Sequence, residues 1–110
     1  MSDEAAQIVP VVVQLAAEID VTNSDEAYRR LTEAAAEGAG IVIADMTSTS
    51  FCDSSGVHAI IRAHDAAAAR HVTLRVAASP DGSVRRVLQL TGAVMVMPVY
   101  STVQEAMSPA

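Results

Sequence analysis

The sequence of 110 residues contains no lysine and no tryptophan, and it has one cysteine, one phenylalanine and two tyrosines. Its seven basic residues are all arginine and face thirteen acidic ones, which gives a net charge of -6. We expect no nucleic-acid partner, because neutralising phosphates requires a basic surface. The single cysteine, Cys52, excludes an internal disulfide and a metal site built from cysteines. With so few aromatic residues, the core must be aliphatic.

Long apolar runs are also missing, and none could cross a membrane. The first seven residues are acidic and are not followed by the apolar stretch of a secretory signal. We therefore expect a cytoplasmic protein without membrane contact. The length and the hydrophobic fraction of 51% predict one folded domain over residues 1–110, with a core from about residue 8 to 107. The acidic surface suits a basic protein partner.

Strand-like and helix-like segments alternate along the chain. Runs of β-branched residues bounded by turn residues predict strands, and apolar residues at helical spacing predict helices. The predicted strands are residues 8–20, in one piece or broken at Pro10, and residues 40–46, 71–78 and 93–100. The predicted helices are residues 23–38, 53–70, 81–92 and 101–107. This alternation indicates an α/β sandwich with a partly parallel sheet.

The same spacing predicts which side chains face the core. Ser101 is expected to cap the last helix. Met95, Val96 and Met97 are most simply core or edge packing, and the other interpretation is an exposed apolar patch. The inward-facing residues predicted in the three longer helices are Ala27, Leu31, Ala34 or Ala35, Val57, Ile60, Ile61, His64, Ala68, Val84, Val87, Leu88 and Leu90 or Thr91.

The stretch FCDSSGVHAII, residues 51–61, places an acid, two hydroxyls and a glycine directly before a helical pattern. The simplest interpretation is a helix cap, in which Asp53 or Ser54 accepts hydrogen bonds from backbone N–H groups. A phosphorelay receiver is another, because Asp45 ends an apolar strand. Such a site needs an acidic pair for magnesium and a lysine, and the chain has no lysine. We therefore interpret Asp45 as a strand-end residue that binds local backbone.

A serine nucleophile is a further interpretation. It would lie on a strand–turn–helix elbow that reads Gly-x-Ser-x-Gly, but Cys52 stands where the first glycine belongs. It would also need a general base. His58 could approach Ser54 but is expected on the solvated face, His64 is expected in the core, and His71 is expected at a helix end. Hydrolysis is thus the weakest hypothesis.

The remaining interpretation is a phosphoacceptor. The start of a helix attracts anions, because its first N–H groups are unpaired. A phosphate on Ser54 would meet these groups and add a charge of roughly -1.5 to -2. The surface would already hold Asp53 and, as we expect, Asp20 and Asp45. Such a modification would act at a docking surface and leave the fold intact.

The longer stretch DMTSTSFCDSSGVHAII, residues 45–61, resembles the signature of bacterial anti-sigma factor antagonists in the STAS family (sulfate transporter and anti-sigma antagonist). AEID, residues 17–20, resembles the family's Gly-Glu-Leu-Asp, with Ala17 in place of the glycine. VRRVLQLTG and VYSTVQEAM resemble the carboxyl-terminal half of the family. The similarity runs from about Val11 to Met107.

The resemblance implies a STAS-type fold, which is a small mixed β-sheet with helices packed mainly on one side. It implies phosphorylation of Ser54 and a partner-binding surface that includes Asp20, Asp53, Ser54, Ser55 and Gly56. The implied partners are an ATP-bound anti-sigma factor serine kinase and a serine phosphatase. The unphosphorylated protein would bind the kinase and release a sigma factor, and phosphorylation would end that complex.

The protein would then be a binding module and not an enzyme, with no cofactor and no metal. The alternative within the family is a STAS scaffold module in a larger signalling assembly. The sequence leaves open whether the protein is a monomer or a weak dimer. Cys52 is expected to be buried and inert, and the competing hypothesis is a thiol sensor beside the motif.

Overall fold

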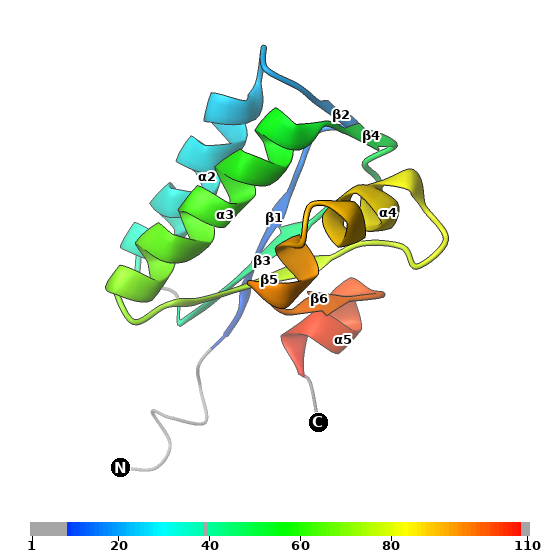
Figure 1. The fold of residues 1–110 in the computed structure, drawn as a ribbon. Coiled ribbons are helices and arrows are strands. Elements are labelled where there is room, and N and C mark those ends of the chain that lie inside the picture. Colours follow the sequence, from blue (N-terminus) through cyan, green and yellow to red (C-terminus); the bar gives the residue numbers. More distant parts are fainter. Residues whose placement is uncertain (1–8, 39, 109–110) are drawn as a thin grey trace.

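The computed structural model of the chain describes residues 9–38 and 40–108 (Figure 1). The alternation of strands and helices predicted from the sequence is confirmed. The strands are β1 (Val11–Gln14), β2 (Glu18–Ile19), β3 (Ile41–Asp45), β4 (Phe51–Cys52), β5 (Thr73–Ala77) and β6 (Val99–Tyr100). The helices are α2 (Ser24–Ala36), α3 (Ser54–Ala69), α4 (Ser83–Leu90) and α5 (Val103–Met107), with a 3-10 turn, η1 (Ala93–Met95).

Two sheets organise these elements. One has four strands in the order β1-β3-β5-β6, and the other consists of β2 and β4. Every strand pair in the described residues is parallel. The carboxyl ends of parallel strands meet at one edge, and β1 and β3 each continue through a short connection into β2 and β4. The small sheet therefore lies at the carboxyl edge of the large one, and it pairs Ile19 with Cys52.

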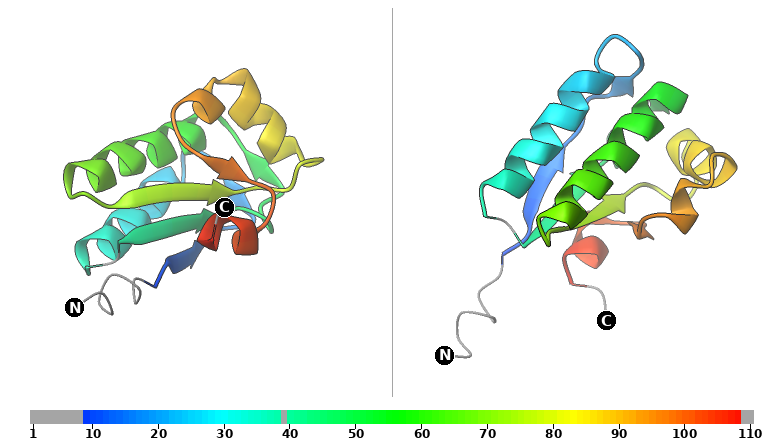
Figure 2. Two further views of the ribbon diagram at one scale, coloured as in Figure 1. Left: turned by 90° about the horizontal axis from the view of Figure 1, so that it is seen from below. Right: turned by 60° about the vertical axis from the view of Figure 1, so that its left-hand side comes forward.

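The helices cover the large sheet unequally, as Figure 2 shows. Helices α2 and α3 lie side by side over one face, and α4 joins the same core. The side chains of Val42 and Ala44 belong to that core, whereas Ile43 points to the other face and packs with Ala77 and with Ala106 of α5. The prediction of an α/β fold with helices mainly on one side is confirmed. The expected mixed sheet is instead parallel throughout the described residues, because each strand of the large sheet returns through a crossover connection. No helix in the described part of the chain is long and apolar enough to span a membrane.

The predicted inner face of α2 is confirmed, but that of α3 is partly wrong. In α3, Val57 and Ile60 are buried and Ile61 is half-buried, whereas His64 is half-buried and Ala68 is exposed. Their places in the core are taken by two residues one position earlier, Ala63 and Ala67. Helix α3 carries alanine on most of its sides, so apolar spacing alone could not identify the face that packs.

Two predicted boundaries differ from the structure, one in the first half of the chain and one at its end. The first strand breaks at residues 15–17 and not at Pro10, which precedes β1, and Ile8 lies outside the described residues. Thr102, not Ser101, caps α5, because its Oγ1 accepts the N–H of Glu105 at 3.0 Å. The Glu105 side chain in turn accepts the N–H of Ser101 at 3.2 Å. This is a Thr-x-x-Glu capping pair displaced by one residue from the predicted start.

Helix α4 ends differently from its prediction. Val84 and Leu88 are buried and Val87 is half-buried, as predicted, but Leu90 and Thr91 are both exposed. The helix has only eight residues and Thr91 is already its C-cap, so its last turn extends beyond the core.

The stretch of residues 93–100 is mostly not the strand predicted there. Gly92 has a φ of 81°, a left-handed conformation that favours glycine, and the chain then forms η1 before β6. Met97 is buried as predicted, but Met95 and Val96 are exposed, so the prediction of core packing was wrong for these two residues. The alternative interpretation, an exposed apolar segment, describes them.

Candidate functional site

Asp53 forms the cap of α3. It lies in an extended conformation directly after β4, and its Oδ1 accepts the N–H groups of Ser55 at 3.0 Å and Gly56 at 3.2 Å. The same oxygen accepts the hydroxyl of Ser55 at 2.6 Å. The Ser55 hydroxyl and these N–H groups lower the pKa of Asp53, so its carboxylate is ionised at neutral pH. The predicted capping role of Asp53 is thus confirmed.

The two adjacent serines differ in their surroundings. Ser55 is half-buried and its hydroxyl is held by Asp53. Ser54 is the first residue of α3 and is exposed, and within residues 9–38 and 40–108 its hydroxyl has no hydrogen-bond partner. Of the pair, Ser54 therefore presents the accessible oxygen.

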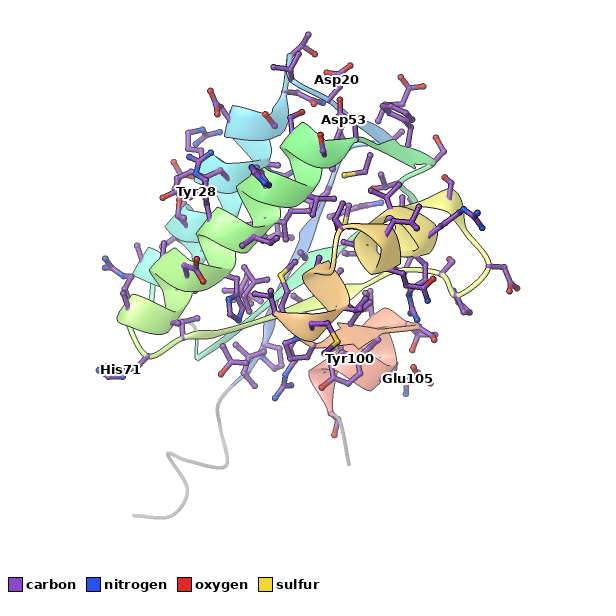
Figure 3. The ribbon with its side chains drawn as sticks, in the orientation of Figure 1. Asp20, Tyr28, Asp53, His71, Tyr100 and Glu105 are labelled. Carbon is purple, nitrogen blue, oxygen red and sulfur yellow. The ribbon has the colours of Figure 1, made fainter. Side chains whose placement is uncertain are left out.

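Asp20 forms a similar turn on the neighbouring strand. Its Oδ1 accepts the N–H of Thr22 at 2.9 Å and the Thr22 hydroxyl at 2.5 Å. Its own N–H donates to Asn23 Oδ1 at 2.9 Å, which leads the chain into α2. Because β2 and β4 are parallel and Ile19 pairs with Cys52, Asp20 and Asp53 leave the small sheet next to each other. Figure 3 shows both side chains at the same end of the molecule.

Gly56 allows α3 to begin directly on the small sheet. A Cβ atom at this position would lie 2.6 Å from Cys52 Sγ and 2.8 Å from Ile19 Cγ2, closer than real Cβ atoms approach. Cys52 itself is buried, as predicted, and burial, with the nearby charge of Asp53, raises the pKa of its thiol to about 11. The thiol is therefore protonated at neutral pH, which fits the expectation of an inert cysteine.

Asp45 was expected on the surface that holds Asp20 and Asp53, but it does not lie on that surface. Its Oδ1 accepts the N–H of Thr47 at 2.9 Å and the Thr47 hydroxyl at 2.6 Å, as predicted for a strand-end residue. It lies two positions after Ile43 in β3, so both side chains belong to the face that α5 covers.

The structure does not assemble a hydrolase site around Ser54. His58 is exposed, and within the described residues no histidine is hydrogen-bonded to Ser54. His64 Nδ1 lies 3.3 Å from Asp65 Oδ1. Figure 3 shows His71 at the far end of the helical layer. Two hollows of about 440 and 360 Å³ are lined by residues around Arg70, at the opposite end of α3. The described residues also contain no group of three or more His, Cys, Asp or Glu that could hold a metal ion.

The model of the STAS domain family matches residues 3–106. The chain belongs to the STAS domain family. Among solved structures, it is similar to an anti-sigma factor antagonist from Mycobacterium paratuberculosis, with 21% identity and a TM-score of 0.73 over 86% of this chain and 80% of that one. No curated protein matches the chain.

The STAS chain is also similar to the anti-sigma factor antagonist SpoIIAA of Bacillus in two states. The unphosphorylated form is 25% identical, with a TM-score of 0.70 over 91% of this chain and 86% of that one. The phosphorylated form is 25% identical, with a TM-score of 0.63 over 91% and 89%. The chain is thus a STAS domain with a fold similar to that of anti-sigma factor antagonists, and the predicted STAS-type fold is confirmed.

One residue of this STAS surface was not singled out from the sequence. Phe51, the single phenylalanine, is exposed on β4 while its neighbour Cys52 is buried. The Ser83 hydroxyl, at the start of α4, donates to the backbone oxygen of Ser50 at 2.8 Å and holds the segment before Phe51. The alternation of strand residues between two faces would have placed Phe51 outward once Cys52 was assigned to the core.

Proposed function

We propose that this protein, as a single STAS domain, is an anti-sigma factor antagonist that works by partner switching. Its unphosphorylated form binds an anti-sigma factor serine kinase, which then releases a sigma factor. The kinase transfers phosphate from ATP to Ser54, the complex separates, and a serine phosphatase restores the first state. The observation that supports this best is the contrast between the exposed, unengaged hydroxyl of Ser54 and the hydroxyl of Ser55, which Asp53 holds.

The surroundings of Ser54 fit a protein-docking surface. The carboxylates of Asp20 and Asp53 are half-exposed beside it, and both are held by short local hydrogen bonds. They present fixed negative charge to a basic patch on the kinase, which favours fast association. Phe51 adds an exposed apolar side chain beside them. Ser55 and Gly56 act indirectly, since one fixes Asp53 and the other lets α3 reach the small sheet.

The structure changes one expectation about the phosphate, namely how much it gains from the start of α3. The two N–H groups that were expected to be unpaired already donate to Asp53. A phosphate on Ser54 therefore lies in solvent beside an ionised carboxylate and gains less from the helix start than predicted. Its main effect is to place a further charge of roughly -1.5 to -2 in the interface, where it must lose water.

In this proposal the protein is a substrate and binding module and not an enzyme. It carries no cofactor or metal, and the ATP belongs to the kinase. Since the kinase needs ATP, the switch operates in the cytoplasm. A scaffold role in a larger signalling assembly is the competing function, and the exposed apolar segment around Met95 is the feature that favours it.

The test begins with Ser54→Ala as bait in extracts of the source cells, supplied with ATP and Mg²⁺, because this variant cannot be phosphorylated out of the complex. The captured kinase is then purified and given labelled ATP with the wild type, Ser54→Ala and Ser55→Ala. We expect label on the wild type and on Ser55→Ala, and none on Ser54→Ala. Label mapped to Ser55, Ser48 or Ser50 would contradict the assignment. A stable multi-protein complex that contains no kinase activity would support the scaffold.

A further inference from the structure

The sulfur atoms in the described residues differ sharply in exposure. The side chain of Met95 is 86% exposed, whereas Met97, only two positions later, is 2% exposed. Met46 is 1% exposed and Met107 is 39% exposed. Peroxides oxidise methionine wherever they reach its sulfur, so exposure largely decides which methionine reacts first.

Met95 belongs to a set of exposed apolar residues close together in sequence, which we call the α4–η1 patch and which comprises Leu90, Val94, Met95 and Val96. All four side chains are exposed, and Leu90 is 75% exposed. Residues 87–104 contain no charged residue, so Met95 has no charged neighbour in this segment of the sequence. In Figures 1 and 2, η1 lies next to α4.

Cys52 is the residue that a search for redox chemistry would select first, but its surroundings oppose reaction. Its side chain is 2% exposed, and Sγ lies 3.5 Å from the backbone oxygen of Asp53. The reactive form of cysteine is the thiolate, and burial raises the pKa of this thiol to about 11. Methionine needs no deprotonation, so its reactivity with peroxide does not depend on such a shift.

We propose that Met95 is the peroxide-sensitive modification site of this protein, and that its oxidation changes the α4–η1 patch from apolar to polar. The sulfur lone pair attacks one oxygen of hydrogen peroxide, an S–O bond forms, and the O–O bond breaks. The sulfur loses two electrons, the peroxide is reduced, and water leaves. The product is methionine sulfoxide, which a thiol-dependent sulfoxide reductase can return to the thioether.

The chemical consequence follows from the composition of the patch. A sulfoxide oxygen is a strong hydrogen-bond acceptor, and here it is placed among Leu90, Val94 and Val96. Retention of the protein by an apolar surface therefore falls on oxidation. The fold is unaffected, because Met95 contributes little buried area while Met97, which does, is protected.

The test treats the purified full chain with hydrogen peroxide under native conditions and follows each sulfur by peptide mass mapping. We expect Met95 to gain one oxygen about tenfold faster or more than Met46 and Met97, with Met107 between them and Cys52 unchanged. Fragment ions locate the added oxygen, because Met95 and Met97 lie in the same peptide. The peptide that carries Met1 is scored apart. In denaturant the four rates should converge, which shows that the fold causes the difference.

A phenyl matrix supplies the second readout. Peroxide should shorten the retention of the wild type, and Met95→Leu, which keeps an apolar side chain of similar size, should show a clearly smaller shift. Cys52→Ser is the matched control and should respond like the wild type. The proposal is overturned if Met97 or Cys52 reacts as fast as Met95, if Met95 is protected, or if Met95→Leu loses as much retention as the wild type.

Discussion

The start of α3 and the α4–η1 patch are both exposed, yet different forces fix their residues. At the start of α3, one oxygen of Asp53 accepts three hydrogen bonds, and Gly56 leaves no room for a side chain. At the patch, the exposed residues are apolar and solvent-facing, and their neighbours Leu88, Ala93 and Met97 are held by packing. Side chains that form local hydrogen bonds can thus be recognised in a sequence, whereas the exposure of apolar residues cannot.

The largest effect should be the difference in stability between truncating one and truncating the other of the two leucines of α4. Leu88 is fully buried, so Leu88→Ala should lower the free energy of unfolding by about 2–5 kcal/mol. Leu90→Ala, two residues away, should change it by less than about 0.5 kcal/mol, because Leu90 is exposed. Urea unfolding of both variants measures this. Equal losses would show that Leu90 is packed and that the patch is not an exposed surface.

A smaller loss is expected from adding one methyl group at the start of α3. Gly56→Ala should destabilise the protein by about 1–3 kcal/mol, because its Cβ meets Cys52 and Ile19. Gly82→Ala is the matched control, since the nearest atom to a Cβ there is 3.6 Å away and the residue also precedes a helix. Thermal melts compare the two. A neutral Gly56→Ala would mean that the close approach of α3 to the small sheet can relax.

At Ser54 the expected effect is on binding and not on folding. Ser54→Asp should weaken kinase binding by at least about tenfold, or about 1.4 kcal/mol, because an added carboxylate must be desolvated beside Asp53. Its melting temperature should stay close to that of the wild type, since a negative charge at the first turn of a helix is tolerated. Ser54→Asn, of similar size but neutral, is the control. Calorimetric titration and melts on the same proteins decide, and loss of affinity through unfolding would refute the docking argument.

The smallest effect concerns the charge of Asp53. Its pKa is lowered from an ordinary value of 3.8, so its ionised form stabilises the folded state above that pH, and the stabilisation is lost as the pH falls through the lowered value. Asn caps helices about as well as Asp but does not titrate. The melting temperature of Asp53→Asn should therefore fall less than that of the wild type between pH 5 and about pH 3. Parallel curves would show that this carboxylate is not held by its hydrogen bonds.

Much of the fold could be predicted because its strands and helices are marked by local rules. The stretch around Asp53 indicates a cap, and Gly38 and Gly92, which both have positive φ, mark the ends of α2 and α4 as predicted. The resemblance of residues 45–61 to a family signature added the fold type. The surface that joins Asp20 to Asp53 also followed from that resemblance, and the pairing of β2 with β4 accounts for it physically.

Other features depend on packing between distant segments, which spacing does not reveal. The core face of α3 was misassigned by one residue in its second half, because alanines occupy several of its sides there. Met95 and Val96 were expected inside, because apolar residues usually are, but a 3-10 turn directs them outward. The difference between Ser54 and Ser55 could not be predicted either, since it rests on which hydroxyl reaches Asp53.

The pairing of β2 with β4 has a consequence for how the Ser54 surface comes into being. Each strand has only two residues, and the partners Glu18 and Phe51 are 33 positions apart in the chain. Between them lie α2 and β3, so the small sheet joins residues that are far apart in sequence and forms only when the chain folds. A nascent, cleaved or unfolded chain therefore contains the sequence of the motif, but its two carboxylates are not held next to each other. An enzyme that requires both carboxylates recognises only the folded protein. A peptide of residues 51–61 contains Asp53 but lacks Asp20.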